Sequence, residues 1–396
     1  MLSAAGIRLR LTATIALITI VLFFASFRVL NPEAHELFEL QEDIPPILDH
    51  AQAKSTVKSS QNSESIYEIY NETLGFQKIY MISLPERTDK QDTFAMQAAF
   101  SEISYILADG VHGDKVPAKA LPHTMSQKAN VIGCWRAHLN VYQKIVHERV
   151  STALVFEDDA DWDVALKHQL VQFARGSRFL ADTVEGDLAH SPYGDDWDML
   201  WIGHCGTWVL PDKNRRFFVI PSDPTVLPPQ LREDNVAKPD MSRWRTNPDG
   251  GEQTRIVFHS EGAVCTSAYA ISQKGARKAI YYLSMVPYNA PVDWGLANLC
   301  KNKEHNFKCV SSWPQLVGVS RPTSNTAKWS DIDSPPDSES TAQDGHSYHL
   351  MYSARQNLQH WLNGTRIFES QYPDIAPPMG ISDIGKAIGY PEILVG

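Results

Sequence analysis

The chain has 396 residues, of which 43% are hydrophobic and 21% charged, a composition that is ordinary for one large or two smaller globular domains. Its formal net charge is −10, and it contains no block rich in lysine and arginine. This balance argues against a nucleic-acid partner.

Residues 11–28 are the first predicted element, an apolar run with no charge before its last residue. A helix rises about 1.5 Å per residue, so this run covers most of a ~30 Å hydrocarbon layer. Arginines precede the run and acidic residues follow it, which places residues 1–10 in the cytosol and the rest in the lumen. The alternative is a cleaved signal peptide, although its apolar region is usually shorter. We therefore expect a single-pass type II membrane protein of the Golgi or endoplasmic reticulum.

Residues 29–75 form a predicted stem, because much of this stretch is polar and would bury little surface. Two N-glycosylation motifs begin at Asn71 and Asn363, in agreement with a lumenal body. We expect a catalytic domain over residues 76–325 and a polar C-terminal extension over 326–396.

The five cysteines also suit an oxidising compartment. Cys300 and Cys309 flank a short polar loop and could close a small disulfide. Cys205 with Cys265 is a second pairing that the sequence allows. The odd count leaves at least one thiol outside such pairs, and burial of all five as small apolar residues stays an alternative.

Short apolar runs alternate with helical patterns through the predicted domain. Strands are expected at 79–82, 103–107, 153–156, 198–202, 256–258, 263–271 and 309–319, and those at 79–82 and 153–156 are expected to be buried. Helices are expected at 94–100, 130–148 and 273–283, the last capped by Ser272. Residues 212–255 are rich in proline and polar residues and predict a long inserted loop. The alternation of strands and helices indicates an α/β sheet.

The strand at 153–156 runs directly into Glu157-Asp158-Asp159-Ala160-Asp161. Carboxylates at the carboxyl end of a strand are typical of ligand sites in open α/β sheets. Three of these acids alternate, so they would share one face if the strand continued. Divalent Mg²⁺ or Mn²⁺ would relieve their repulsion and could bridge a diphosphate. The alternative is a solvated acidic turn.

Seven short segments follow one another in a recognisable order. They are ISLPERTDK from Ile82, ADG from Ala108, GCWRAH from Gly133, ALVFEDD from Ala153, WDML from Trp197, YAISQKGA from Tyr269 and PVD from Pro291. Together they resemble glycosyltransferase family 25, which includes bacterial lipooligosaccharide and animal collagen galactosyltransferases. The sequence departs from the family at Ser83, where asparagine is usual, at Ala137, where serine is usual, and in the long 212–255 loop.

The resemblance implies a GT-A-like nucleotide-sugar transferase fold. It also implies inverting transfer of a hexose, usually galactose, from a UDP-sugar to a glycan or glycoprotein acceptor. On the donor side, it suggests that Arg87 contacts the nucleotide or its phosphates and that Asp109 holds the uridine part. Gly110 is a further candidate for binding the nucleotide-sugar, and His138 borders the site. The alternatives are an exposed arginine, a plain Asp-Gly turn and a buried helix histidine with satisfied hydrogen bonds.

Glu157, Asp158 and Asp159 stand where the family carries its metal-binding carboxylates, so the resemblance implies a divalent metal there, with Mn²⁺ as the first choice. Asp159 is the first candidate ligand and Glu157 the last, and the sequence leaves open which two bind the metal. An inverting transfer needs a base to take the proton of the acceptor hydroxyl, and Asp293 is the first candidate. Its alternative role is to cap the helix predicted directly after it. Glu261 is the second candidate base.

Two other classes of function stay open. A metal-dependent hydrolase or nuclease could use the same acids, but the sequence shows no compact second set of histidine and aspartate ligands. A non-catalytic adhesion or lectin-like membrane protein could share the fold without the chemistry. Binding of UDP with Mn²⁺ separates a transferase from a lectin-like module.

Overall fold

The computed structural model describes residues 66–183, 189–211, 214–232, 237–246, 251–326, 329–332 and 341–395. The predicted cytosolic tail, the transmembrane segment at 11–28 and most of the predicted stem lie outside these residues. Within the described ranges, no helix combines the length and the apolar character that crossing a membrane requires.

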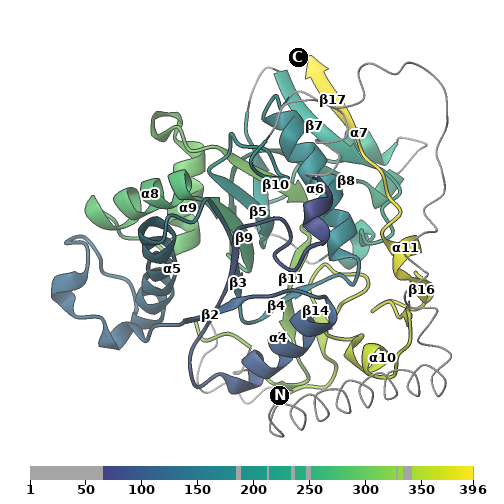
Figure 1. Cartoon of the computed structure of the whole chain (residues 1–396), viewed down its shortest axis with the longest axis horizontal. Coiled ribbons are helices and arrows are strands. Elements are labelled where there is room, and N and C mark those ends of the chain that lie inside the picture. The colour runs from purple at the N-terminus through teal and green to yellow at the C-terminus, as the bar shows by residue number, and fades with distance from the viewer. Residues whose placement is uncertain are drawn as a thin grey trace, which may run out of the picture. The chain divides into compact units, whose positions relative to one another are not determined.

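A mixed sheet of thirteen strands carries the fold (Figure 1). Nine strands form its main path, in the order β17 (Tyr390–Val395), β7 (Asn214–Ile220), β8 (Arg255–Val264), β10 (Cys309–Trp313), β5 (Met199–Gly203), β9 (Ala268–Ser272), β3 (Thr152–Glu157), β1 (Lys78–Ser83) and β2 (Ile106–Asp109). Four more branch from it, namely β4 (Ala160–Trp162), β6 (Gly206–Val209), β11 (Val317–Arg321) and β14 (His346–Ser347). Strands β3, β1 and β2 are neighbours and parallel, so their carboxyl ends meet at one edge.

Helices cover both faces of this sheet (Figure 1). One face carries α5 (Ala129–His147), α8 (Gln273–Ile280) and α9 (Val292–Lys301), and the other carries α4 (Thr88–Phe100) and α6 (Leu166–Leu180). Alternate side chains of β1 divide between the two cores. Tyr80 and Ile82 join the core beneath α5, while Ile79 and Met81 join the core beneath α4 and α6. The α/β class predicted from the sequence is confirmed, and the arrangement is compatible with a GT-A-like fold.

The remaining described elements are short. The helical turns are η2 (Glu68–Tyr70), η3 (Gly113–Lys115), η4 (Ala118–Ala120), η5 (Pro229–Leu231), α7 (Ser242–Arg245), η6 (Gly251–Gln253), the π-turn η7 (Tyr281–Met285), η8 (Lys303–His305), α10 (Leu358–Leu362) and α11 (Ile381–Ile384). The short strands are β12 (Ser324–Asn325), β13 (Thr341–Ala342), β15 (Ile367–Phe368) and β16 (Met379–Gly380).

Several predicted elements agree closely with the structure. The apolar stripe of α5 is buried at Ile132, Trp135, Leu139 and Tyr142. The hydroxyl of Ser272 accepts a hydrogen bond from the Gly275 amide at 3.0 Å, so it caps α8 as predicted. These features were predictable because helical periodicity and capping depend on residues within a few positions of one another.

Two predictions about organisation need correction. Residues 212–255 are not simply a loop, because β7 pairs with both β8 and β17. The nearby prolines hid this strand in the sequence. The residues expected to form a polar extension also enter the core, where Leu350, Met351 and Tyr352 are buried. The packed body therefore extends well beyond residue 325.

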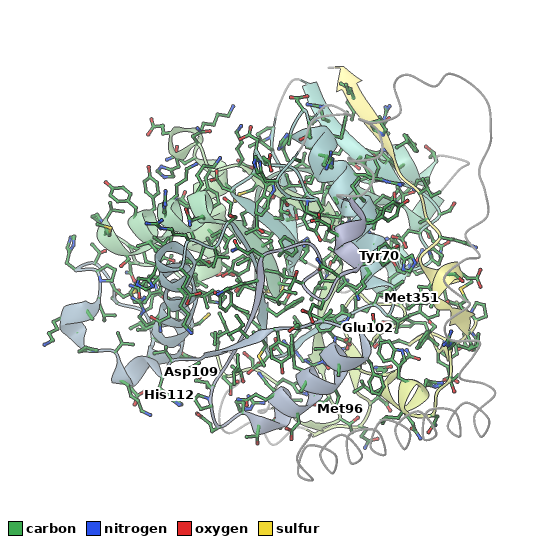
Figure 2. All side chains as sticks on the ribbon, viewed as in Figure 1. Tyr70, Met96, Glu102, Asp109, His112 and Met351 are labelled. Carbon is green, nitrogen blue, oxygen red and sulfur yellow. A yellow bond between two sulfur atoms is a disulfide. The ribbon has the colours of Figure 1, made fainter. Side chains whose placement is uncertain are left out.

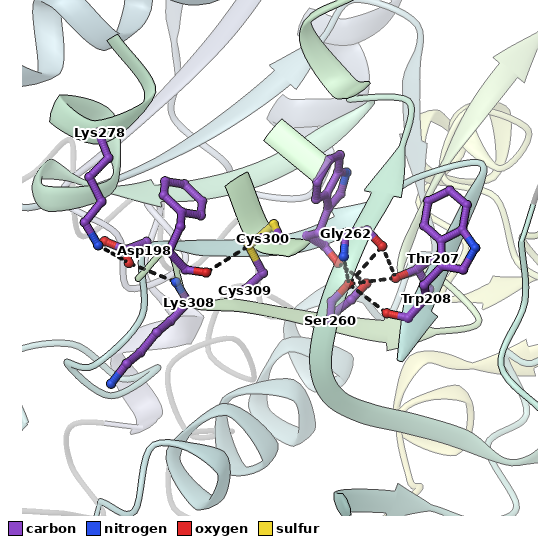
Figure 3. The surroundings of a disulfide bond; sticks show 12 residues. Asp198, Thr207, Trp208, Ser260, Gly262, Lys278, Cys300, Lys308 and Cys309 are labelled. Carbon is purple, nitrogen blue, oxygen red and sulfur yellow. Dashed lines mark hydrogen bonds and ion pairs between the residues drawn. A yellow bond between two sulfur atoms is a disulfide. The ribbon is translucent and has the colours of Figure 1, made fainter. Parts of the chain in front are cut away.

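The structure contains the disulfides Cys205–Cys265 and Cys300–Cys309, the two pairings that the sequence allows. The second joins the end of α9 to the start of β10 (Figure 3). Beside it, the buried carboxylate of Asp198 accepts hydrogen bonds from the Lys278 ammonium and the Lys308 amide, both at 2.9 Å. These contacts fasten α8 and α9 to the sheet.

Candidate active site

A pocket with an empty volume of about 940 Å³, part of it open to solvent, lies at the carboxyl edge of β1 and β3. Its lining includes Ile82 to Leu84, Lys90, Gly110 to Asp114, Gly133, Cys134, His138, Glu157 to Asp159 and Asp331. The acidic segment at the end of β3 therefore lies around the same pocket as residues of α4 and α5.

Two glycines let the 110–115 loop form one wall of the pocket. A Cβ atom on Gly113 would lie 1.6 Å from the carbonyl oxygen of Ala129 at the start of α5. A Cβ atom on Gly133 would lie 2.1 Å from the carbonyl oxygen of Val111. Backbone cannot yield to such contacts, so the loop rests directly against the helix only because both positions lack a side chain.

Asp158 faces a lysine across the pocket. Its carboxylate accepts a hydrogen bond from Lys90 at 2.9 Å and another from the Ser83 hydroxyl at 2.8 Å. Lys90 also reaches Asp331 at 3.1 Å. Burial and repulsion from Asp159 raise the pKa of Asp158 to about 6, although Lys90 opposes both. The site therefore holds two close carboxylates with a buried ammonium beside them.

Asp159 has its own cationic partner, Arg321, at 3.2 Å. Repulsion from Asp159 is one of the causes that raise the pKa of Asp158, and a divalent cation bound by both would relieve it. Their oxygens suit Mn²⁺ or Mg²⁺. Asp158 and Asp159 therefore fit the predicted metal, on condition that the cation replaces part of their pairing with Lys90 and Arg321.

Glu157 does not join the other two acids. Its carboxylate accepts a hydrogen bond from the Thr266 hydroxyl at 2.6 Å and lies 3.2 Å from Nε2 of His138. Burial alone would raise the pKa of Glu157, but the contacts with His138 and Thr266 lower it below its usual value. The alternation that placed three acids on one face also fails, because a turn at Asp158-Asp159 ends β3, and Asp161 points into the core from β4.

Asp293 lies at the other side of the sheet's carboxyl edge. Its two oxygens accept hydrogen bonds from the amides of Cys265 at 2.9 Å and Trp294 at 2.8 Å. It stands inside the first turn of α9, whose N-cap is Pro291, so the alternative role as N-cap is not what the structure shows. Burial raises the pKa of Asp293, and repulsion from Glu157 adds to the effect. A buried carboxylate with a raised pKa is a suitable general base.

Residues 76–182 match the family model for glycosyltransferase family 25, described as an LPS biosynthesis protein. This segment supplies β1, β2, β3, α4 and α5, which build the pocket. The resemblance seen in the sequence motifs is thereby confirmed, and it covers the donor-side candidates. Asp293 and Glu261 lie outside the matched segment.

Curated relatives point to the same family. Procollagen galactosyltransferase 2 of Mus musculus is 22% identical over 351 residues, which are 80% of this chain and 48% of the relative. Procollagen galactosyltransferase 2 of Homo sapiens is 23% identical over 352 residues, with the same two shares. The chain thus spans about half the length of these relatives. Inactive glycosyltransferase 25 family member 3 of Homo sapiens is 23% identical over 144 residues, 33% of this chain and 22% of the relative.

The donor-side candidates of the family 25 segment are not all equally close to the pocket. Gly110 and His138 line it, but Asp109 lies on the exposed end of β2 and borders a neighbouring hollow with Lys144. Figure 2 shows Asp109, the last residue of β2, close to His112, which lies on the loop that follows this strand. Arg87 is held by Asp89 at 3.0 Å and by Asp331, which itself lines the pocket. Arg87 therefore stands at the rim.

Glu261 is placed away from the pocket. Its carboxylate lies 3.7 Å from the ammonium of Lys301 at the far end of α9. Lys301 is eight residues from Asp293, about 12 Å along the helix axis. The geometry therefore favours Asp293 over Glu261 as the base. Asn71 and Asn363, the glycosylation candidates, are both exposed.

Sequence reasoning gave no role to several residues of the site. Lys90 and Ser83 lie within the first family motif, so their positions were visible but their contacts with Asp158 were not. No sequence motif points to Thr266 or Arg321. Each comes into contact with the acidic segment only because strands that are distant in the sequence pair in the sheet. Pairing between distant strands is the information that was missing.

Proposed function

We propose that this chain is a glycosyltransferase that moves a hexose, with galactose as the first choice, from a UDP-sugar to a hydroxyl of a glycan or glycoprotein, with inversion. The observation that carries the proposal is the pocket in which Asp158 and Asp159 face Lys90, inside the segment that matches the family 25 model. The curated relatives named as procollagen galactosyltransferases support a sugar donor and a protein-linked acceptor.

The donor side of the reaction needs positive charge near the diphosphate. Lys90 lines the pocket with its ammonium between Asp158 and Asp331, so it can turn toward a phosphate oxygen once a cation replaces part of its pairing with Asp158. A divalent cation, Mn²⁺ in this proposal, would be held by Asp158 and Asp159 and would supply further charge neutralisation. Gly110 and His138 would border the nucleotide, and Arg87 would reach it from the rim.

The acceptor side of the reaction needs a base. The Asp293 carboxylate would take the proton of the acceptor hydroxyl as its oxygen attacks the anomeric carbon and the bond to the diphosphate breaks. The Cys265 amide holds one oxygen of Asp293 in place. A nucleophile activated on the face opposite the leaving group gives inversion.

The same proposal includes the predicted setting of the enzyme. Residues 11–28 would anchor it as a type II membrane protein of the Golgi or endoplasmic reticulum, with the catalytic body in the lumen. The two disulfides and the exposed positions of Asn71 and Asn363 are compatible with that compartment.

The test is UDP release by the purified full-length chain with a panel of UDP-sugars, in Mn²⁺ and in chelator. We expect metal-dependent release from one donor, lost in Asp159→Ala and kept in Asp92→Ala, which changes an exposed carboxylate on α4. Release that is equal in chelator would refute the metal site. An absence of both UDP release and UDP binding would refute the transferase.

A non-catalytic role on the same fold is the second candidate, because a relative named inactive also matches the chain. Such a module would bind a glycan without binding UDP. Retention of glycan binding in chelator, with no UDP binding in Mn²⁺, would favour this candidate over the transferase.

A further inference from the structure

Three side chains of the pocket form a group that the proposed reaction does not use as a set. The Cys134 thiol, one imidazole nitrogen of His138 and one carboxylate oxygen of Glu157 all lie within 4.8 Å of one another. Cys134 and His138 are four residues apart on α5, so they project from the same face of the helix, and Glu157 ends the adjacent β3. All three line the pocket.

We infer that Cys134, His138 and Glu157 form a Zn²⁺ site whose fourth position opens to the pocket. Thiolate and imidazole ligands select Zn²⁺ over Mn²⁺ or Mg²⁺, which prefer oxygen. The site is therefore chemically distinct from the one proposed at Asp158 and Asp159. Three protein ligands and one open position are typical of zinc sites that bind a small molecule or water.

The spacing of the three ligands needs little adjustment. Tetrahedral coordination at the usual zinc bond lengths separates ligand atoms by about 3.3–3.7 Å. Nε2 of His138 and the carboxylate oxygen of Glu157 are already 3.2 Å apart. All three ligand atoms lie within 4.8 Å of one another, so the Cys134 sulfur would have to approach the other two atoms by about 1 Å at most. Cys134 is half-buried at the pocket wall, where it packs against the core beneath α5.

Buried groups behind the site hold two of the ligands in position. The other ring nitrogen of His138 lies 2.7 Å from the Tyr269 hydroxyl, which lies 2.8 Å from the Tyr142 hydroxyl. The Thr266 hydroxyl donates to Glu157 at 2.6 Å. Such outer contacts fix the orientation of zinc ligands and strengthen binding. Zn²⁺ binds a thiolate and a neutral imidazole, so its binding releases the proton of the Cys134 thiol.

The test uses the full chain, freed of metal, with Co²⁺ as a coloured substitute for Zn²⁺. We expect one equivalent of Co²⁺ to produce a thiolate-to-cobalt charge-transfer band, and Zn²⁺ to abolish it. Cys134→Ser should remove the band and weaken Zn²⁺ binding at least about tenfold. Tyr269→Phe should keep the band while weakening Zn²⁺ binding by about 10–100-fold.

Two controls separate this site from other sources of binding. His112→Gln removes a different histidine of the same pocket, which pairs with Glu86 at 2.7 Å, and should bind Zn²⁺ as the parent does. Asp159→Ala should also keep the thiolate band, so failure of the proposed transferase would not affect this result. Thermal melting without metal establishes that each variant is folded. A parent chain without the band, or Cys134→Ser with unchanged Zn²⁺ affinity, would overturn the inference.

Discussion

At the scale of single residues, the surroundings of Asp293 suit the proton transfer that we propose for this carboxylate. Its oxygens accept two backbone amides, which favour the charged form, while burial and the nearby Glu157 favour the neutral form. Burial is the largest of these effects, and the pKa of Asp293 rises above its usual value. A base with a raised pKa holds the transferred proton more readily than an exposed carboxylate does.

We expect Asp293→Asn to lower kcat by about 10²–10⁴-fold, the usual contribution of a general base. Donor affinity should not change, because Asp293 does not line the donor pocket. In the parent enzyme, kcat should fall as the pH drops through the raised pKa of Asp293, because only the carboxylate can accept a proton. This acidic limb should disappear in the variant.

The matched control is Glu261→Gln, which changes the second candidate base beside Lys301. Its kcat should stay within about threefold of the parent value. A large loss in Glu261→Gln together with an active Asp293→Asn would reverse the assignment of the two acids.

At the scale of elements, the Cys205–Cys265 disulfide connects the residues after β5 to the link between β8 and β9. Cys265 has a φ of +63°, a left-handed conformation that few residues other than glycine adopt. Its amide binds Asp293, and the next residue, Thr266, binds Glu157. The link between β8 and β9 therefore holds two carboxylates in position, those of Asp293 and Glu157.

We expect the double variant Cys205→Ser, Cys265→Ser to lose about 2–4 kcal/mol of unfolding free energy, since the disulfide closes a long loop. Its kcat should also fall, because without the disulfide the backbone at residue 265 is held less firmly and its amide positions Asp293 less well. Chemical denaturation and steady-state kinetics measure the two effects. Cys300→Ser, Cys309→Ser is the control, because that pair lies away from Asp293 contacts and closes only a short loop. Equal losses of kcat in both double variants would contradict the positioning role.

At the scale of the whole molecule, residues 341–395 pack into the folded domain instead of forming a separate extension. Arg355 donates hydrogen bonds to the carbonyl oxygens of Asp158 and Ala160, both at 2.8 Å. Asp161 accepts hydrogen bonds from the hydroxyls of Ser347 and Ser353. The C-terminal segment thus fixes the acidic turn from behind, on the side away from the pocket.

We expect Arg355→Ala to lower the unfolding free energy by about 1–3 kcal/mol, because the carbonyl oxygens lose their donor and Asp161 loses a nearby positive charge. The affinity for a divalent cation at Asp158 and Asp159 should fall as well, since the turn is less well fixed. Arg366→Ala, an exposed arginine of the same segment, serves as the control and should change neither quantity. An unchanged melting temperature in Arg355→Ala would show that the tail does not support the turn.

The sequence by itself determined the local elements and the family. The buried strand before Glu157, the stripe of α5 and the Ser272 cap all depend on residues a few positions apart, so their patterns are readable directly. The order of the motifs also supplied the candidates for the donor side of the site. Asp293 became the candidate base in the same way, from the short segment that contains it.

Only the tertiary structure decided which of these residues meet. Asp158 is paired with Lys90, 68 positions away, and Asp159 with Arg321, 162 positions away. The turn that ends β3 sends Glu157 toward His138 and Asp161 toward the core, although the three acids alternate in the sequence. Strand pairing and packing between distant segments set these contacts, and no local period encodes them.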